Sequence, residues 1–345
     1  MSSVPDSIRD VHQLEDLLSE PTPYLSNAFR EVSGDVIVLG VAGKMGPTLA
    51  RMAKRTLDVL GKESRVIGVA RFTNPVEQKK LESWGVETIR ADLLDEGQLN
   101  RLPDAPNVIY MAGMKFGATG NERLTWAMNC LLPAMVCKRF NASRIVAFST
   151  GNVYGLSSVS RGGSKETDEL NPVGEYAMSC LGRERMFEHC SRSMSIPVSI
   201  IRLYYATEMR YGVLVDIAQR VRRGEEIDVS MGHLNAIWQR DANAQSLACL
   251  PRASGPPFVI NVVGPEVLRV RSVADAFGRM LGKTVNLIGH EAGDALLGDS
   301  SLSRSLFGEP SAGADLLLKW IADWVRRGGE SLNKPTHFEE RAGKF

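Results

Sequence analysis

The stretch VIVLGVAGKMGPTLA, residues 36–50, decides the fold class of this sequence. A short β-branched run at 35–40 predicts a buried strand, and a helical pattern at 47–61 follows it. Three glycines at a spacing of three separate the two: Gly40, Gly43 and Gly46. The first permits a tight turn, the second lets the main chain approach a pyrophosphate, and the third lets helix and strand pack closely. With free N–H groups at the helix start, the loop predicts a dinucleotide site, and we place Lys44 and Met45 in it.

The same rhythm of strand and helix continues along the next 160 residues. Apolar, β-branched runs at five further places predict strands, at 65–70, 86–92, 107–113, 144–150 and 197–206. A segment with helical spacing precedes each of them, so the strands are expected to form one parallel sheet covered by helices on both faces. Glycine triplets also mark ordinary turns, but a triplet after the first of six such strands favours the nucleotide site. The expected fold is α/β, a doubly wound parallel Rossmann sheet.

After residue 206 the rhythm changes. Helical patterns and a single strand pattern at 258–264 predict a smaller α+β portion, packed on the carboxyl edge of the sheet. We therefore divide the chain into an N-terminal helical extension (1–32), a Rossmann domain (33–206), a substrate-binding portion (207–333) and a C-terminal tail (334–345). Segments of the substrate-binding portion can also join the sheet.

Composition excludes several classes of protein. The 345 residues carry 41 Lys and Arg against 40 Asp and Glu, which gives a formal charge of +1 and no general attraction for nucleic acid or for an anionic membrane. No apolar run is long enough for a membrane span, and the first 30 residues are too acidic for a signal peptide, so we expect a cytoplasmic protein. Five cysteines without a CxxC pair, and five scattered histidines, favour reduced thiols and predict no metal site.

The choice of dinucleotide depends on the end of the second strand. An acidic residue there would bind the ribose hydroxyls of NAD, but this strand ends in Ala70 and Arg71, which suits the 2′-phosphate of NADP. Lys44 adds a second cation inside the glycine loop. We therefore expect NADP, with NAD as the other option, although both cations can also be ordinary solvated charges.

Residues at the ends of the third and fourth strands complete the expected cofactor site. Asp92, which closes the third strand, can accept a hydrogen bond from the adenine amino group, or it can be the N-cap of the next helix. Leu93 follows it. Ala112 and Gly113 end the fourth strand and are expected to border the cofactor.

Two further motifs resemble the extended short-chain dehydrogenase/reductase family, of the NAD(P)-dependent epimerase/dehydratase type. FSTGNVYG (148–155) closes the fifth strand, and Tyr176 follows Tyr154 by 22 residues in NPVGEYAMSCLGRERMFE. The resemblance extends over residues 35–330 and includes Asn129 and the segments 224–229 and 260–277. It implies a Rossmann enzyme that acts on a sugar, sugar acid or sugar nucleotide.

The resemblance assigns catalytic roles to Thr150, which would orient the substrate, and to Tyr176, which would transfer the proton. The family's lysine four residues after the tyrosine is absent, because Cys180 stands there. That lysine lowers the tyrosine's pKa, and a phenol with its ordinary pKa of about 10 is a poor base at neutral pH. A thiol cannot replace it, and we interpret Cys180 as a small buried filler.

Three hypotheses account for the missing lysine. A cation from elsewhere can replace it, either Lys115 at the carboxyl end of the fourth strand or Arg183, which shares a helical face with Tyr176. Both can equally be solvated charges. The chemistry can also proceed without tyrosine as the base, or catalysis has been lost and the protein is a non-catalytic NADP-binding redox sensor or scaffold.

We place the substrate site near the ends of the fifth and sixth strands. Asn152, Tyr205 and Arg210 are the candidate substrate-binding residues, since an amide, a phenol and a guanidinium suit a polyhydroxylated or anionic ligand. Packing for the tyrosine and a structural ion pair for Arg210 are the alternatives. Family likeness also suggests a homodimer through the helices that carry Asn129 and Tyr176, although the apolar residues of helix 122–140 can instead cover the sheet.

Overall fold

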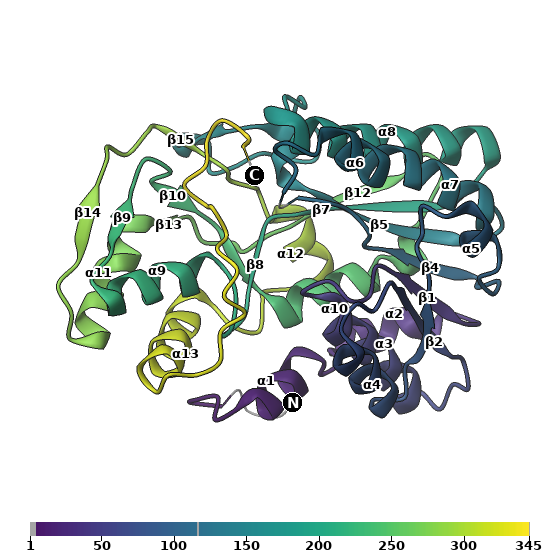
Figure 1. The fold of residues 1–345 in the computed structure, drawn as a ribbon, viewed down its shortest axis with the longest axis horizontal. Helices are drawn as coiled ribbons and strands as arrows, with labels where there is room; N and C mark the ends of the chain where they lie inside the picture. The colour runs from purple at the N-terminus through teal and green to yellow at the C-terminus, as the bar shows by residue number, and fades with distance from the viewer. Residues whose placement is uncertain (1–4, 116, 345) are drawn as a thin grey trace.

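A seven-stranded parallel sheet forms the centre of the computed structural model, which describes residues 5–115 and 117–344 (Figure 1). Its strands are β1 (Val36–Leu39), β2 (Val66–Ala70), β3 (Glu87–Arg90), β4 (Asn107–Tyr110), β5 (Arg144–Thr150), β7 (Val198–Leu203) and β12 (Phe258–Val262). In space they run in the order β12, β7, β5, β4, β1, β2, β3, and each neighbouring pair is parallel. The expected doubly wound Rossmann fold is confirmed.

The central strand β1 is apolar and buried at all four positions, so helices cover it on both faces. In β1, Val36 and Val38 face one helix layer while Ile37 and Leu39 face the other. The first layer contains α2 (Pro23–Arg30), α3 (Gly46–Val59) and α10 (Gln239–Ala248), and the second contains α5 (Glu96–Asn100), α7 (Leu132–Arg139) and α8 (Gly174–Met194). α4 (Pro75–Ser83) connects β2 to β3. Figure 1 shows the two layers above and below the sheet.

The structure adds detail to two of the predicted strands. The run 197–206 divides into β7 and a separate strand β8 (Tyr205–Thr207), which pairs with β11 (Ala236–Trp238). β12 lies in the sequence of the substrate-binding portion, and it pairs with β7 and extends the main sheet, which is the recruitment that the sequence analysis allowed. The reason is its two apolar faces, since Ile260 is buried in one core of the sheet and Val259 packs against the other.

The substrate-binding portion has a core of its own. Three amphipathic helices pack together there: α9 (Val213–Arg223), α11 (Val270–Leu281) and α13 (Ala314–Arg326). The short strand pairs around them are β9 (Glu226–Asp228) with β14 (Asn286–Ile288), β10 (His233–Leu234) with β13 (Leu268–Arg269), and β15 (Asp294–Ala295) with β6 (Ser157–Ser158). α12 (Ser301–Phe307) packs beside β12.

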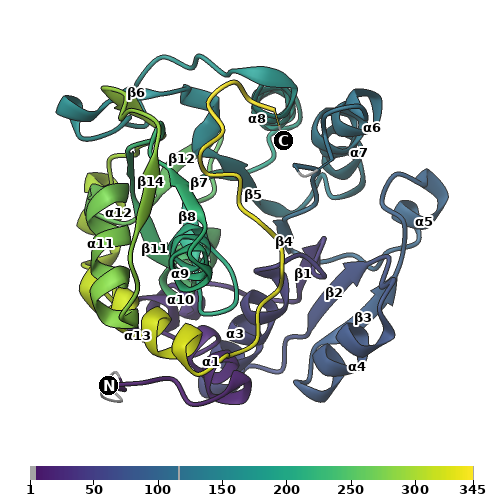
Figure 2. The ribbon, with the colours of Figure 1, turned by 60° about the vertical axis from the view of Figure 1, so that its left-hand side comes forward.

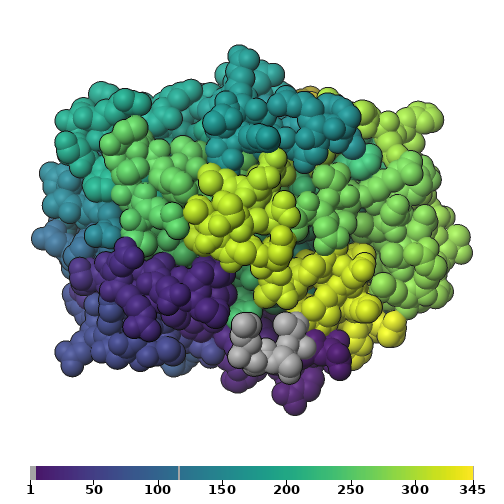
Figure 3. Space-filling view, turned by 180° about the vertical axis from the view of Figure 1, so that it is seen from behind, coloured from purple at the N-terminus to yellow at the C-terminus, as the bar shows by residue number. Residues whose placement is uncertain are grey.

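The N-terminal extension joins the two cores. In α1 (Val11–Leu18), Leu14 and Leu18 are buried in the core of the substrate-binding portion, whereas Phe29 of α2 is buried in the core of the sheet. Seen from behind, its purple surface lies directly beside yellow residues of the C-terminal part (Figure 3). The extension therefore holds the two portions of the chain together. Residues 1–4 of it, and residue 345 of the tail, lie outside the described residues.

The C-terminal tail runs along the boundary between the two portions. It leaves α13 as an extended segment, crosses in front of the sheet edge and ends beside the N-terminus of α8 (Figures 1 and 2). There the two backbones meet so closely that a Cβ atom on Gly174 would overlap the carbonyl of Gly343. No helix within residues 5–115 and 117–344 is long and apolar enough to cross a membrane.

The predicted helix 122–140 forms as three joined pieces. α6 (Glu122–Trp126) continues into a π-helical turn, η1 (Ala127–Leu131), and then into α7. A π turn inserts one extra residue into the helix and often marks a functional position. Here it carries Asn129.

Candidate functional site

The candidate site lies where the strand order of the sheet changes direction. β1 has β2 on one side and β4 on the other, so the loops after β1 and β4 leave a crevice between them at the carboxyl edge. Ligands of doubly wound sheets bind in this crevice. The loop after β1 is the glycine loop, and the loop after β4 carries Lys115.

Glycine is needed at the three positions of the loop for different structural reasons. A Cβ on Gly40, whose φ is 89°, would come within 2.7 Å of the backbone nitrogen of Ala112, and one on Gly46 would overlap the carbonyl of Val41. These two glycines serve the packing of the protein itself. A Cβ on Gly43 would meet nothing closer than the Gly40 carbonyl oxygen at 3.5 Å. Gly43 is exposed, so its bare backbone leaves room for a ligand and not for a neighbouring side chain.

The start of α3 provides hydrogen-bond donors at the same place. Met45 is its N-cap residue, and no side chain of the described residues caps this end. The first N–H groups of a helix lack partners within it and carry the positive end of the helix dipole. Together with the open face of Gly43, this fits the diphosphate of a dinucleotide.

Two hollows extend from the glycine loop in opposite directions. The larger has a volume of about 540 Å³ and reaches towards Thr150 and Tyr176. The other, of about 470 Å³, reaches past the ends of β2 and β3. Gly40, Gly43 and Gly113 line both. An elongated ligand with its middle at the glycine loop would thus place one end in each hollow.

The second hollow brings together the residues expected at the adenosine end: Arg71, Asp92, Leu93, Ala112 and Gly113. Arg71 is exposed and forms no ion pair with the residues that the structure describes. The Asp92 carboxylate accepts a hydrogen bond from the backbone N–H of Leu94 at 3.0 Å, and the N-cap of α5 is Asp95 instead.

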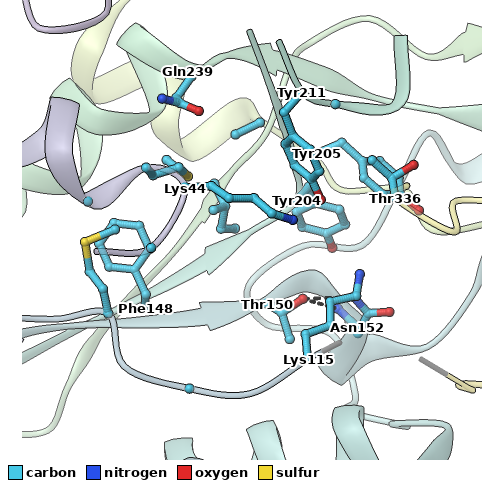
Figure 4. Close-up of a pocket in the computed structure, with 18 of the residues that line it drawn as sticks. Lys44, Lys115, Phe148, Thr150, Asn152, Tyr204, Tyr205, Tyr211, Gln239 and Thr336 are labelled. Atoms are coloured by element: carbon cyan, nitrogen blue, oxygen red, sulfur yellow. Dashed lines mark hydrogen bonds between the residues drawn. The ribbon is translucent and has the colours of Figure 1, made fainter. Parts of the chain in front are cut away.

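The larger hollow brings together the expected catalytic residues. Thr150 ends β5 and caps the 3-10 turn η2 (Gly151–Tyr154), where its hydroxyl accepts hydrogen bonds from the Asn152 backbone N–H at 3.2 Å and from the Asn152 amide at 2.9 Å (Figure 4). Tyr176 lies in the first turn of α8 and lines the same hollow. Burial raises the pKa of Tyr176, and a hydrogen bond with the side chain of Thr150 offsets a part of this rise.

Cys180 does not replace the lysine electrostatically. Its side chain is fully buried in an apolar cluster with Val153, Tyr204 and Leu296. Burial raises the pKa of the thiol, so it is neutral at neutral pH. The proximity of Cys180 also raises the pKa of Tyr176. The interpretation of this cysteine as a small buried filler agrees with its place in the fold.

Lys115 lies beside the tyrosine, as one of the replacement hypotheses expects. Its ammonium is 5.5 Å from the centroid of the Tyr176 ring, and it lines the larger hollow. Burial lowers the pKa of Lys115 to about 8. In Figure 4 the Lys115 side chain lies beside those of Thr150 and Asn152.

Asn129 fixes the Lys115 loop relative to α8. Its amide accepts a hydrogen bond from the backbone N–H of Met114 and donates one to the Met114 carbonyl, both at 2.9 Å. It also donates to the Ser179 hydroxyl of α8 at 2.9 Å. The π turn therefore sets the spacing between Lys115 and the helix that carries Tyr176.

Arg183 is buried next to the site. Its guanidinium donates to the carbonyl of Phe148 at 2.7 Å and to the Asn129 side chain at 2.5 Å. It does not line the larger hollow. Its charge nevertheless lowers the pKa of Tyr176. The two candidate cations therefore lie in different places, because Arg183 is buried and Lys115 lies on the wall of the cavity.

Of the candidate substrate residues, two lie where expected and one does not. Asn152 and Tyr205 line the larger hollow. Arg210 does not, because its guanidinium is held by the buried carboxylates of Glu208 at 3.1 Å and Glu15 at 3.0 Å. The structural ion pair, which was the alternative for Arg210, is the arrangement observed.

The comparison with protein families agrees with this geometry. The sequence pattern of the NAD dependent epimerase/dehydratase family matches residues 36–229. The chain belongs to this family. A search of curated protein sequences found no match.

Solved structures of epimerases share the fold of this family member. UDP-glucuronic acid 4-epimerase from Bacillus cereus, solved with NAD, is 18% identical, with a TM-score of 0.69 over 85% of this chain and 96% of its own. UDP-glucose 4-epimerase from Thermotoga maritima, solved with UDP-glucose, is 16% identical, with a TM-score of 0.69 over 85% and 99%. The UDP-Glc/GlcNAc 4-epimerase from Campylobacter jejuni is 19% identical, with a TM-score of 0.69 over 86% and 100%.

Sequence reasoning missed the contribution of the C-terminal tail to the site of this epimerase/dehydratase family member. Lys334 and Thr336 of the C-terminal tail line the larger hollow. The tail has no periodic pattern, so the sequence carries no signal for its course. Among the described residues, no three His, Cys, Asp or Glu side chains gather into a set that could hold a metal ion.

Proposed function

We propose that the protein is an NAD(P)-dependent enzyme that transfers hydride between a nicotinamide and a carbon of a sugar, sugar acid or sugar nucleotide. One observation carries the proposal. The groove that begins at Arg71 passes the open glycine loop and ends at Thr150 and Tyr176. A dinucleotide in this groove would supply the hydride, as nicotinamides do.

The chain's own residues would orient the substrate and handle the proton. Thr150 would hold the reacting oxygen, and the Tyr176 phenol would donate its proton to that oxygen or accept one from it. Because burial raises the phenol's pKa, Arg183 and Lys115 must together favour the ionised form when the tyrosine acts as a base. We propose Lys115 as the cation that replaces the family's lysine at the wall of the cavity.

The proposed cofactor is NADP, with NAD as the second option. Arg71 stands at the end of β2, where the 2′-phosphate would lie, and it is exposed on the wall of the adenosine hollow. UDP-glucuronic acid 4-epimerase from Bacillus cereus was solved with NAD, which supports NAD as the second option.

Epimerisation, dehydration and simple oxidation require different further groups. A dehydratase needs another acid and base beside the substrate. Glu166 and Asp168 do not provide them, since Glu166 accepts a hydrogen bond from the Asn261 backbone at 2.8 Å and Asp168 is paired with Arg161 at 3.0 Å. Neither lines the larger hollow. This favours an oxidation, a reduction or an epimerisation.

A non-catalytic redox sensor is the second candidate function. The observation that favours it is the pair Cys180 and Tyr176, because a buried neutral thiol stands where the lysine would ionise the phenol. The sensor would bind the dinucleotide and report its redox state to a partner without turnover.

One pair of measurements separates the enzyme from the sensor. Tryptophan quenching would measure the affinities for NADPH and NADH, and absorbance at the nicotinamide band would follow turnover over a panel of sugars, sugar acids and sugar nucleotides. The enzyme predicts binding together with turnover of at least one compound. Tight binding without turnover, and no gain of turnover in Cys180→Lys, would support the sensor instead.

A homodimer is also part of the proposal. Leu124, Leu131 and Met178 are large apolar side chains that are 47%, 56% and 48% exposed, and they lie on α6, η1 and α8. Exposed apolar groups gathered on neighbouring helices mark interaction surfaces. Light scattering after size exclusion is expected to give twice the mass of the chain, and Leu131→Asp is expected to give the single mass.

A further inference from the structure

The C-terminal tail reaches the middle of the cofactor groove. A third, smaller hollow of about 210 Å³ lies behind the glycine loop. It shares part of its wall with the two hollows already described. Ala42, Gly43 and Lys334 line all three. Lys334 therefore lies at the meeting point of the hollows, together with the part of the loop that is open to a ligand.

Hydrogen bonds hold the tail on both sides of Lys334. Two residues before it, the backbone N–H of Leu332 donates to the Arg210 carbonyl at 3.0 Å. Two residues after it, the N–H and hydroxyl of Thr336 donate to the Asp216 carboxylate at 2.7 Å and 2.5 Å. Between them, Asn333 has a φ of 50°, a left-handed conformation that asparagine tolerates and that turns the chain just before the lysine.

The rest of the tail is fixed as well. Glu339 forms an ion pair with Arg220 of α9 at 2.8 Å. Arg341 pairs with the Asp294 carboxylate and donates to the Ser230 carbonyl at 3.2 Å. Hydrogen bonds and ion pairs thus attach the tail to the substrate-binding portion along its length. They hold the segment that carries Lys334 in place.

The charges near Lys334 point to an anionic ligand. The pKa of Lys44 in the glycine loop is lowered to about 7, first by burial and then by the charges of Lys115 and Lys334. The Asp216 carboxylate opposes this effect, but it also accepts the two hydrogen bonds from Thr336. The charges of Lys115 and Lys334 both oppose the charged form of Lys44, and an anion bound between these side chains would relieve that repulsion. The Lys334 ammonium donates no hydrogen bond to another described residue, so its donors are available.

We propose that Lys334 binds the diphosphate of the dinucleotide from the side opposite the glycine loop. The C-terminal tail is then one of the segments that form the cofactor site. The proposal rests on the proposed function, because it takes the ligand of the groove to be a dinucleotide. The diphosphate would lie between main-chain N–H groups on one side and the tail ammonium on the other. The tail would also cover the middle of the bound ligand.

The test compares binding by the full-length protein and three variants. Lys334→Gln removes the charge, Lys334→Arg keeps it, and Lys344→Gln is the control, since Lys344 is an exposed lysine of the same tail that lines none of the hollows. Isothermal titration calorimetry with ADP-ribose, NADH, NADPH and adenosine gives the affinities, and circular dichroism checks the fold.

Lys334→Gln is expected to bind ADP-ribose, NADH and NADPH about tenfold more weakly, the loss for one charge-assisted hydrogen bond, and to bind adenosine as the wild type does. Lys334→Arg is expected to restore most of the affinity, and Lys344→Gln to match the wild type. Unchanged affinity for ADP-ribose in Lys334→Gln, or an arginine variant no better than the glutamine variant, would overturn the proposal.

The remaining outcomes separate this proposal from the function on which it rests. A loss confined to NADPH would place Lys334 on the 2′-phosphate and would also overturn the proposal. A wild-type protein that binds neither ADP-ribose nor NADH would instead refute the dinucleotide site itself, and with it the role of Lys334. Wild-type binding with an unaffected glutamine variant would leave the proposed function standing and reject the tail contact alone.

Discussion

The ammonium of Lys115 lies 5.5 Å from the ring centroid of Tyr176, although the two residues come from different elements and are 61 positions apart. Asn129 fixes this relationship by binding the Met114 backbone on one side and Ser179 of α8 on the other. A neighbouring loop thus places a cation beside the phenol, and we propose that this cation replaces the lysine absent from position 180. This is the physical basis for expecting catalysis in a chain that lacks the lysine of its family.

Lys115→Met tests that basis. Removing the ammonium is expected to lower kcat about tenfold to a hundredfold, because a positive charge that would stabilise the phenolate is lost. The affinity for NADPH, measured by tryptophan quenching, is expected to stay within about twofold. Lys138→Met is the control, since Lys138 is an exposed lysine of α7 that lines neither of the two large hollows. Equal activity in both variants would reject Lys115 as the replacement cation.

Arg71→Ala tests the preference for NADP. If Arg71 contacts the 2′-phosphate, the variant is expected to bind NADPH about tenfold more weakly while its affinity for NADH is unchanged. Competitive titration with both reduced dinucleotides measures the ratio. An equal loss for the two cofactors would contradict the assignment of Arg71 to the 2′-phosphate.

The lowered pKa of Lys44 predicts that dinucleotide binding depends on pH. Its pKa is about 7, lowered by burial, Lys115 and Lys334 and raised by Asp216. A bound diphosphate favours the charged form and raises this pKa, so binding takes up a proton at pH values above 7 and not at pH values well below it. Affinity is therefore expected to fall about tenfold from pH 6 to pH 8.

Calorimetry in buffers with different ionisation enthalpies measures that proton uptake. Lys44→Met is expected to remove the uptake between pH 6 and pH 8, whereas Lys138→Met keeps it. Lys115, whose pKa is about 8, adds uptake only at the upper end of this range. Binding that is independent of pH in the wild type would show that the anion does not reach Lys44.

The glycine loop offers a matched pair of substitutions. Gly46→Ala is expected to destabilise the fold by about 1–3 kcal/mol, because its Cβ would overlap the Val41 carbonyl and the backbone must shift. Gly43→Ala has free space around its Cβ, so the fold keeps its stability and only dinucleotide affinity falls. Urea denaturation and NADPH titration separate the two effects. A Gly43→Ala variant that binds as tightly as the wild type would show that no ligand approaches this glycine.

The sequence predicted the sheet and the cofactor end of the site because both are local patterns. Continuous apolar strands such as Val36–Leu39 require cover on both faces, and the glycines stand within one loop. The partner strand of β12 was not predictable in this way. The apolar sequence of β12 predicts a buried strand, but its neighbour in the sheet, β7, is known only from the three-dimensional structure.

Long-range partners account for the other differences. Arg210 suited an anion by its residue type, yet one of its carboxylate partners, Glu15, lies 195 positions away in the N-terminal extension. Lys334 stands in a tail without periodicity, and its place beside Gly43 depends on attachments to Arg210 and Asp216. Residues held by such contacts carry no local signal of their position.

We propose that the groove directs a nicotinamide and a substrate to the phenol of Tyr176, and the variant Tyr176→Phe tests this claim. Nicotinamide absorbance measures kcat on any sugar or sugar derivative that the wild type converts, and quenching measures NADPH affinity. The phenylalanine variant is expected to lose about 10²-fold to 10⁴-fold in kcat, the contribution of one positioned acid or base, with its NADPH affinity unchanged. A variant that turns over at the wild-type rate would contradict the claim.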